Sequence, residues 1–371
     1  MKYLVGDFLT GRRIQTIPDV ISGTWAERLN AADSLSCTVP LNDPGVRKLG
    51  LPQSATPWKS FLAAIDGTTV LAFGPVLGHS YAENENQELT ITAGGVWDWF
   101  TDKRLLLPEL AGRLPSDPTT DTNLVSSLQG IAVQWVTQAL SITGANIPMV
   151  LPSVIGGTNE RNEAGANMAF VGERLTQLTQ VEGGPDIKFA GRFTTDMLGI
   201  ETVMQVGTPT QPQIFGAIRP TFNVGLPQSS VSNFKLTTDG SHMGSRAFAS
   251  GGRGSDEVLI TQSDDSTLPD AGYVFMEMVD SSHSTVSEGP TLQGYSDELV
   301  VAGRKPVITF TFDHALDRIP SISGFNVGDY ANVKIKNNGY LPDDTYVSRI
   351  VGRSGDAQGK KVSLTFQAVQ G

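Results

Sequence analysis

The residues that could carry chemistry are four histidines and a few pairs of neighbouring carboxylates. Asp313 precedes His314, and such a pair could provide a general base together with the carboxylate that orients it. We interpret the pair instead as the polar end of a loop that follows a strand. No two histidines stand at the H-x-x-x-H spacing of a helical metal site. The four histidines are His79, His242, His283 and His314.

Three carboxylate pairs lie in polar stretches, namely Asp264 with Asp265, Asp343 with Asp344, and Glu83 with Glu85. We expect them to be solvated, or at most to form a weak cation site, because a glycosidase pair needs one carboxyl with a raised pKa. The glycine-rich stretch 250–256 lacks the G-K-[ST] ending of a phosphate loop and is predicted to be a flexible turn. No G-x-S-x-G motif supplies a hydrolase nucleophile. The sequence therefore predicts no catalytic, cofactor or metal site, and a protein that is not an enzyme.

The composition is that of a folded protein with an acidic surface. Of 371 residues, 39% are hydrophobic and 18% charged, and the formal net charge is −11. This charge argues against wrapping nucleic acid, which needs a basic surface, but suits a surface past which DNA slides. The single cysteine, Cys37, alternates with Leu35 and Val39 and is predicted to be buried in a strand. No signal peptide or membrane span is visible, so we expect synthesis in a cytoplasm.

The first part of the chain has the pattern of short strands. Residues 34–41 alternate between apolar and polar, and Asp66-Gly67 is a hairpin signal between two further strands. Residues 89–93 form the last strand of this part. The aromatic run 97–100 follows it, and we interpret this run as a plug that closes the domain.

The pattern then changes to a helical period. Leu128, Ile131 and Trp135 continue a stripe that starts at Leu124, and Asp121 or Thr122 is the expected N-cap of this helix. Trp135 is predicted to be core. A second helix is predicted from Val171, Leu175 and Leu178, and the polar stretch 156–163 is predicted to be a loop. Residues 190–300 are predicted to return to strands.

The last part of the chain again predicts a small closed sheet. Gly328-Asp329 has the composition of a turn, and residues 331–335, 345–351 and 362–368 are expected to form three antiparallel strands. Ala331, Val333 and Ile335 would face inward. The outward positions could contact a neighbouring protein, although we favour a solvated face; they are Asn332, Lys334 and Lys336.

These patterns predict a mainly β fold with an α+β insert and two β-barrel-like domains, one at each end of the chain. We predict four domains: an N-terminal β-barrel-like domain 1–95, an α+β insert with two helices 96–190, a β-rich middle domain 191–300, and a C-terminal β-barrel-like domain 301–371.

Several stretches, taken in order, resemble the tail-tip (baseplate) hub or minor tail proteins of long-tailed bacteriophages, most closely those of phages that infect actinobacteria. They lie in both end domains and between them, and together they cover most of the chain. The stretches are Ile21–Asn30, Ser34–Leu41, Asn42–Pro44, Glu173–Leu178, Gly184–Phe189, Val231–Leu236, Ala249–Gly254 and Val327–Asp329.

This resemblance implies a structural hub of the virion that takes part in host cell entry. Three copies would form a homotrimeric ring, and the two barrels of each copy would give that ring a pseudo-six-fold face. The face would dock on the distal tail protein ring, the tape-measure protein would end inside, and DNA would pass through at genome ejection without specific binding. Other tail-tip proteins would be further partners. Because the chain ends at Gly371, after the last barrel strand, we expect none of the hydrolase or receptor-binding extensions of some relatives.

Two other readings remain open. A receptor- or carbohydrate-binding tail protein would use exposed aromatic side chains to stack on sugars. A cell-wall hydrolase at the tail tip would depend on Asp313 and His314. The tryptophans available for stacking are Trp25, Trp58, Trp97, Trp99 and Trp135.

Overall fold

The computed structural model describes residues 1–106, 122–181, 183–227, 229–253, 258–281, 286 and 289–368. The chain divides into two compact units. The first unit comprises residues 1–234 with 311–369, and the second comprises residues 235–310 with 370–371. Among the described residues, no helix has the length and apolar composition needed to cross a bilayer.

Seven strands and two short helices form the N-terminal part of the first unit. They are β1 (Lys2–Asp7), β2 (Arg13–Ile17), β3 (Ser22–Arg28), β4 (Ser34–Pro40), α1 (Pro44–Arg47), α2 (Leu51–Ser54), β5 (Ser60–Asp66), β6 (Thr69–Ala82) and β7 (Glu88–Gly94). The predicted hairpin at Asp66-Gly67 is confirmed, because Asp66 pairs with Thr69 and Gly67 adopts a φ of 58°. Such a φ strains any residue with a Cβ atom, which explains the glycine.

Six strands and one short 3₁₀ helix form the C-terminal part of the same unit. They are β13 (Thr221–Val224), β14 (Val231–Asp239), β18 (Val307–Ala315), η3 (Ile322–Gly324), β19 (Tyr330–Ile335), β20 (Asp344–Asp356) and β21 (Lys361–Ala368). Of these, β14 belongs to the unit up to Phe234 and β18 from Thr311. The predicted turn and the three antiparallel strands are confirmed. Ala331, Val333 and Ile335 are fully buried, as their alternation predicts.

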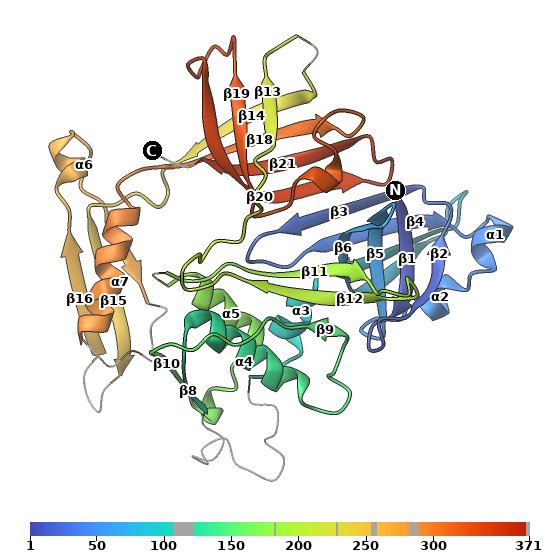
Figure 1. The fold of residues 1–371 in the computed structure, drawn as a ribbon, viewed down its shortest axis with the longest axis horizontal. Coiled ribbons are helices and arrows are strands. Elements are labelled where there is room, and N and C mark those ends of the chain that lie inside the picture. Colours follow the sequence, from blue (N-terminus) through green and yellow to red (C-terminus); the bar gives the residue numbers. More distant parts are fainter. Residues whose placement is uncertain are drawn as a thin grey trace. The chain divides into compact units, whose positions relative to one another are not determined.

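One hydrogen-bonded sheet of 13 strands runs through both parts, in the order β14-β18-β21-β20-β3-β4-β7-β6-β5-β1-β2 (Figure 1). Off this path, β19 pairs with β20, and β13 pairs with β19. The connection between the two parts is the antiparallel pair β3–β20, in which Arg353 stands opposite Glu27. Strands β1–β7 make one barrel-like part, and the C-terminal strands make the other. The mainly β class with an α+β insert is confirmed.

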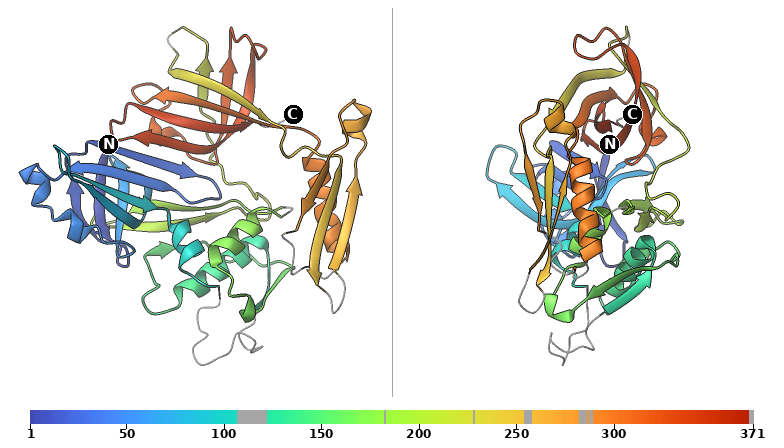
Figure 2. Two further views of the ribbon diagram at one scale, coloured as in Figure 1. Left: turned by 180° about the vertical axis from the view of Figure 1, so that it is seen from behind. Right: turned by 90° about the vertical axis from the view of Figure 1, so that its left-hand side faces the viewer.

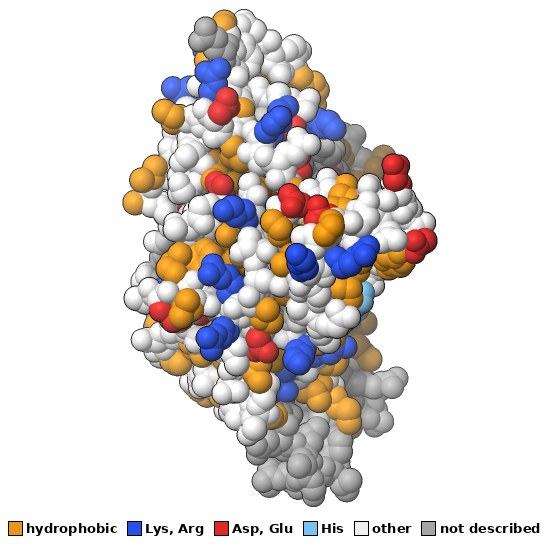
Figure 3. Space-filling view, turned by 90° about the vertical axis from the view of Figure 1, so that its right-hand side faces the viewer, with side chains coloured by type: hydrophobic (Ala, Val, Ile, Leu, Met, Phe, Trp, Pro, Cys, Tyr) orange, Lys and Arg blue, Asp and Glu red, His pale blue; other side chains and the backbone are white. Residues whose placement is uncertain are grey.

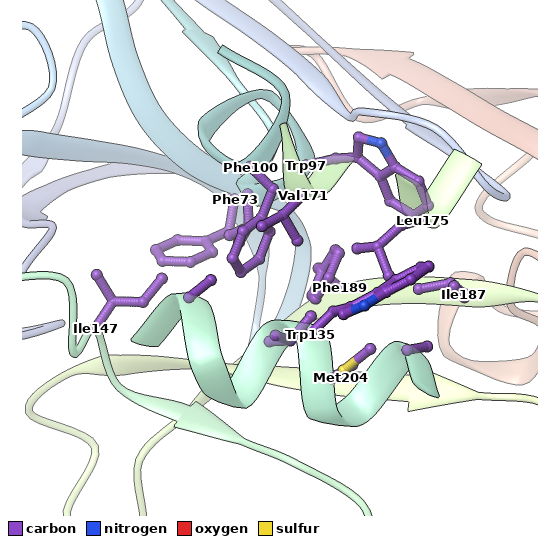
Figure 4. Close-up of a cluster of buried hydrophobic side chains, with 14 of the residues drawn as sticks. Phe73, Trp97, Phe100, Trp135, Ile147, Val171, Leu175, Ile187, Phe189 and Met204 are labelled. Atoms are coloured by element: carbon purple, nitrogen blue, oxygen red, sulfur yellow. The ribbon is translucent and has the colours of Figure 1, made fainter. Parts of the chain in front are cut away.

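The insert between these parts places helices against a small sheet. Its elements are α3 (Val96–Asp102), β8 (Thr122–Ser126), α4 (Leu128–Leu140), β9 (Met149–Val150), β10 (Asn159–Glu163), η2 (Gly165–Asn167), α5 (Val171–Thr179), β11 (Ile187–Phe193) and β12 (Ile200–Val206). Figure 4 shows the apolar side chains of α3, α4 and α5 gathered against β11 and β12. The predicted plug is part of this core: the rings of Trp97 and Phe100 lie 5.6 and 5.1 Å from that of Phe189.

The first predicted helix begins later than expected. Thr122 opens strand β8, so it is not the N-cap, and Asp121 lies outside the described residues. The helix α4 starts after Ser127, whose hydroxyl accepts a hydrogen bond from the Gly130 N–H at 3.0 Å. The loop prediction for 156–163 was wrong over Asn159–Glu163, because this segment pairs with β8 as strand β10. Pairing with a distant segment outweighed local propensity in both cases.

The second unit is a three-stranded sheet with one long helix. Its elements are β15 (Arg246–Arg253), β16 (Val258–Asp264), α6 (Thr267–Asp270), β17 (Glu277–Asp280) and α7 (Gly289–Ala302). The strand order is β16-β15-β17, and α7 covers one face of the sheet (Figure 2). The helix α7 corrects the prediction of strands throughout residues 190–300. The four-domain division by residue number stays a prediction.

Candidate functional site: a buried charge cluster

The structure separates the two residues that resembled a catalytic pair. Asp313 and His314 are consecutive residues of β18, and consecutive side chains of a strand point to opposite faces. His314 is fully buried and its Nε2 donates to the carbonyl oxygen of Pro320 at 2.7 Å, whereas the Asp313 carboxylate accepts from Asn233 at 2.7 Å. The loop-end prediction was wrong, since both lie within the strand. Burial lowers the pKa of His314, so the imidazole stays neutral near pH 7.

The other candidate residues are core or solvated. Cys37 is fully buried, as predicted, and burial raises its pKa to about 12, which rules out a thiolate. His79 and His242 are exposed, and His283 lies outside the described residues. In the part of the chain that the structure describes, no group of three His, Cys, Asp or Glu side chains could hold a metal ion. Among the tryptophans, Trp25, Trp97 and Trp135 are buried, and Trp58 and Trp99 are half-buried.

The structure also shows where the predicted carboxylate pairs and the predicted glycine-rich turn lie. Asp264 and Asp265 each pair with an arginine, Arg246 and Arg304, and thus differ from a solvated pair. The paired acids at 343–344 and at 83 and 85 are exposed. The turn predicted at 250–256 was wrong for its first four residues, which belong to β15, and residues 254–256 lie outside the described part.

A cluster of buried charges lies where the insert and the two barrel-like parts meet. One carboxylate oxygen of Glu27 in β3 forms an ion pair with Lys188 of β11. The other oxygen forms an ion pair with Arg353 of β20. All three side chains are almost completely buried. Arg353 Nη1 also donates to the carbonyl oxygens of Phe325 at 3.0 Å and Ile322 at 3.3 Å. We call Glu27, Lys188 and Arg353 the junction cluster.

Electrostatics favour ionised groups in the junction cluster. Burial alone would raise the pKa of Glu27, but the adjacent Arg353 and Lys188 outweigh burial and hold that pKa below its ordinary value. Burial and the nearby Glu27 carboxylate raise the pKa of the half-buried Asp33 well above its usual range. A proton on Asp33 would therefore be held more tightly than on an ordinary aspartate. The cluster thus balances one carboxylate against two cations with a second carboxyl group beside them.

A second buried pair stands beside the first. Arg349 of β20 pairs with Asp186, the residue before β11, and its Nε donates to the Gly328 carbonyl oxygen at 3.1 Å. The other contacts of Asp186 reach the N-terminal part and the segment after β12: Asn30 Nδ2 donates to it at 3.1 Å and the Ile214 N–H at 2.8 Å. One carboxylate therefore ties together three stretches that are distant in the sequence.

This arrangement suits rigidity rather than catalysis. A substrate could not reach side chains that are buried on every side, and a buried ion pair adds little net stability compared with apolar packing. Such a pair does penalise any other arrangement of the segments, because an unpaired charge would then be left in the interior. The junction cluster therefore fixes the register of β3 against β20 and the position of β11 beside both.

Sequence reasoning missed these residues, although one signal was available. Glu27 shares its strand face with Gly23 and Trp25, both buried, so the alternation already pointed its carboxylate inward. Lys188 and Arg353 gave no such signal. Their burial depends on which strands lie beside them, and local patterns do not show that.

The chain is similar to known proteins in its fold. No protein-family model matches the sequence, and no curated protein matches it. Solved structures do match. The 43 kDa tail protein of prophage MuSo2 from Shewanella oneidensis is 13% identical, with a TM-score of 0.58 over 100% of this chain and 98% of its own. A tail protein from Neisseria meningitidis MC58 is 11% identical, with a TM-score of 0.55 over 99% and 95%.

A third structure agrees with these two. Prophage tail protein gp18 from Listeria monocytogenes EGD-e is 15% identical, with a TM-score of 0.51 over 99% of this chain and 94% of its own. At such low identity the likeness is one of fold. The resemblance to phage tail proteins is confirmed at that level. The narrower resemblance to phages of actinobacteria stays a prediction.

Proposed function

Because the chain shares its fold with prophage tail proteins along nearly its whole length, we propose that it is the structural hub of a phage tail tip. In this role three copies form a ring that closes the tail tube and joins the six-fold tail to the tip. The ring lets DNA pass at ejection. Its place is in the virion, at the tail tip, after synthesis in the host cytoplasm.

The observation that carries this proposal is the rigid connection between the two barrel-like parts. They share one sheet through β3 and β20, and the junction cluster fixes that register. Three copies would present six barrel-like parts at fixed spacing, which suits docking on a six-fold ring. Two domains on a flexible linker could not hold such a spacing.

Charge supports passage of DNA without specific binding. The net charge of −11 makes the chain repel the phosphate backbone, so DNA would not adhere while it moves through the ring. The partners we propose are two further copies, the distal tail protein ring above, the tape-measure protein and other tail-tip proteins. We propose no enzymatic role, in keeping with a site made of buried ion pairs.

Native mass spectrometry of the purified protein, followed by negative-stain imaging, tests this proposal. We expect a trimer with a central hole, either alone or after co-expression with the distal tail protein. A stable dimer would contradict the proposal, and so would a chain that stays monomeric in the presence of that partner.

A further inference from the structure

A three-fold ring built from one kind of chain needs two different faces on each copy, because head-to-tail contacts are heterologous. This inference rests on the proposed ring and asks which faces meet. Two exposed apolar surfaces of opposite charge character answer that question. One lies on the second unit and the other on the first.

The first surface is the face of the three-stranded sheet that α7 leaves uncovered, which we call the open face. Ala247 and Ala249 point toward the helix side and are fully buried, so the alternate residues point the other way. Ile260 is 61% exposed and Val279 is 72% exposed. The sheet is mixed, with β15 parallel to β17 and antiparallel to β16, and α7 covers its other face. The apolar side chains of the open face are Phe248, Val258, Ile260, Phe275 and Val279.

Carboxylates border the open face at one end. Asp264, Arg246 and Glu277 stand side by side across the three strands. Arg246 Nε donates to Asp264 at 2.5 Å, whereas Glu277 lies 3.9 Å from Arg246, too far for a hydrogen bond. The row holds two carboxylates and one guanidinium, so its net charge is negative. A partner surface would need apolar groups with a cation at their edge.

The second surface has those properties. The loop between β1 and β2 is held against the tip of the β11–β12 hairpin, because the Arg13 N–H donates to the Leu198 carbonyl at 3.0 Å and the Ile200 N–H to that of Gly11 at 2.8 Å. Both segments expose apolar side chains beside a hollow of about 470 Å³, and the β1–β2 side also exposes Arg12 and Arg13. Figure 3 shows Lys and Arg side chains among hydrophobic ones on this side of the molecule. We call this surface the loop face; it consists of Leu9, Arg12, Arg13, Ile14, Met197 and Leu198.

The charge of the loop face opposes that of the chain as a whole. Lys2 joins Arg12 and Arg13 there, against Asp66 and Asp196. The Asp196 carboxylate already accepts from the Thr194 hydroxyl at 2.5 Å and the Leu198 N–H at 3.0 Å. The chain as a whole has a net charge of −11, so an acidic face should bind this positive surface in preference to the rest of the chain.

The hairpin tip also carries strain. Met197 has a φ of 59° and a 43% exposed side chain. An apolar residue in this backbone region costs free energy, and such residues cluster at binding sites.

We propose that the open face of one copy binds the loop face of the next copy around the ring. Apolar side chains would meet in the middle, and Glu277 would reach Arg13 at the edge. Contact between two open faces is disfavoured, because it would bring acidic rows together.

A charge-reversal experiment tests this contact by native mass spectrometry and sedimentation. Glu277→Lys and Arg13→Glu should each weaken trimer formation about tenfold or more, because like charges would then face each other. The double variant should recover most of that loss. Matched controls are Glu298→Lys on the exposed side of α7 and Lys334→Glu on β19, and both should leave the trimer unchanged.

Engineered cysteines give a second readout. Under oxidation, the Ile260→Cys, Leu198→Cys double variant should yield a covalent trimer on a denaturing gel, since the native Cys37 is buried. The wild type could form trimers while both charge-reversal variants form them equally well and the cysteine variant does not crosslink between copies. That result would overturn the assignment of these two faces, but not the hub. A wild-type chain that never forms trimers would overturn the hub and this contact together.

Discussion

Replacing Arg353 by methionine should destabilise the first unit strongly. Methionine keeps much of the apolar stem and fills irregular space, so the change removes mainly the charge and the hydrogen bonds. Glu27 would keep one cation, Lys188, inside the protein. The carbonyl groups of Phe325 and Ile322 would lose their donor.

The expected cost follows from these lost contacts. The remaining Glu27–Lys188 pair is balanced in charge, so the cost comes from the buried carboxylate and carbonyl oxygens that lose the Arg353 donor, at about 1–3 kcal/mol for each one left unsatisfied. An exposed pair offers the matched comparison: Arg192 and Glu201 lie on adjacent strands at 2.8 Å, with the Arg192 side chain 56% exposed. Breaking such a pair costs about 0–1 kcal/mol. Arg192→Met should therefore differ little from the wild type.

Urea unfolding followed by tryptophan fluorescence measures the difference. Trp25 is a nearby reporter, since the Arg353 guanidinium lies 6.0 Å from its ring centre. The loss of stability is the shift in midpoint multiplied by the slope of the transition. Arg353→Lys should fall between wild type and Arg353→Met, because lysine keeps the charge but lacks the planar fork.

If Arg353→Met unfolds at the same urea concentration as Arg192→Met, the junction cluster does not hold β20 against β3. The rigid connection that supports the proposed hub would then need another source.

Three smaller predictions follow from single contacts. Burial lowers the pKa of His314, so the unfolded chain binds a proton at His314 more readily than the folded one. Stability should therefore fall as the pH drops through about 6.5. In thermal unfolding between about pH 7.5 and 5, a His314→Phe variant should show a smaller fall. Ser127→Ala should cost about 1–2 kcal/mol in urea unfolding, since the Gly130 N–H loses its acceptor and the Ile155 carbonyl oxygen loses a donor. Ser127→Thr keeps the hydroxyl and should retain most of that stability. A Cβ atom on Gly74 of β6 would lie 2.1 Å from the carbonyl oxygen of Gly94 in β7, so Gly74→Ala should lower the midpoint of thermal unfolding. An unchanged midpoint would show that β6 and β7 can move apart at this point.

Much of the local structure could be predicted from the sequence. Alternation located the inward residues of β19, and the stripe of Val171, Leu175 and Leu178 located the buried face of α5. These patterns succeed because a strand or helix with one buried face repeats apolar residues at its own period. The helix α7 was missed for the same reason. Its buried stripe includes Ser296, and glycines interrupt its sequence, so the periodic signal is weak.

The candidate site was harder to predict because it depends on contacts across the chain. Nothing near Arg353 in the sequence indicates that Glu27 will stand opposite it. A strand slip of one residue would turn both side chains to the other face, and only the pairing of β3 with β20 sets their register.

The β3–β20 pair also constrains how the chain is made. Glu27 and Arg353 are 326 residues apart, so at about 5–20 residues per second β20 leaves the ribosome roughly 15–65 s after β3. Until then, one edge of β3 has no partner from β20, and an open strand edge is a template for aggregation. The first unit can complete its sheet only after β20 and β21 have been synthesised. Its yield in cells should therefore depend on chaperones that protect this edge during translation.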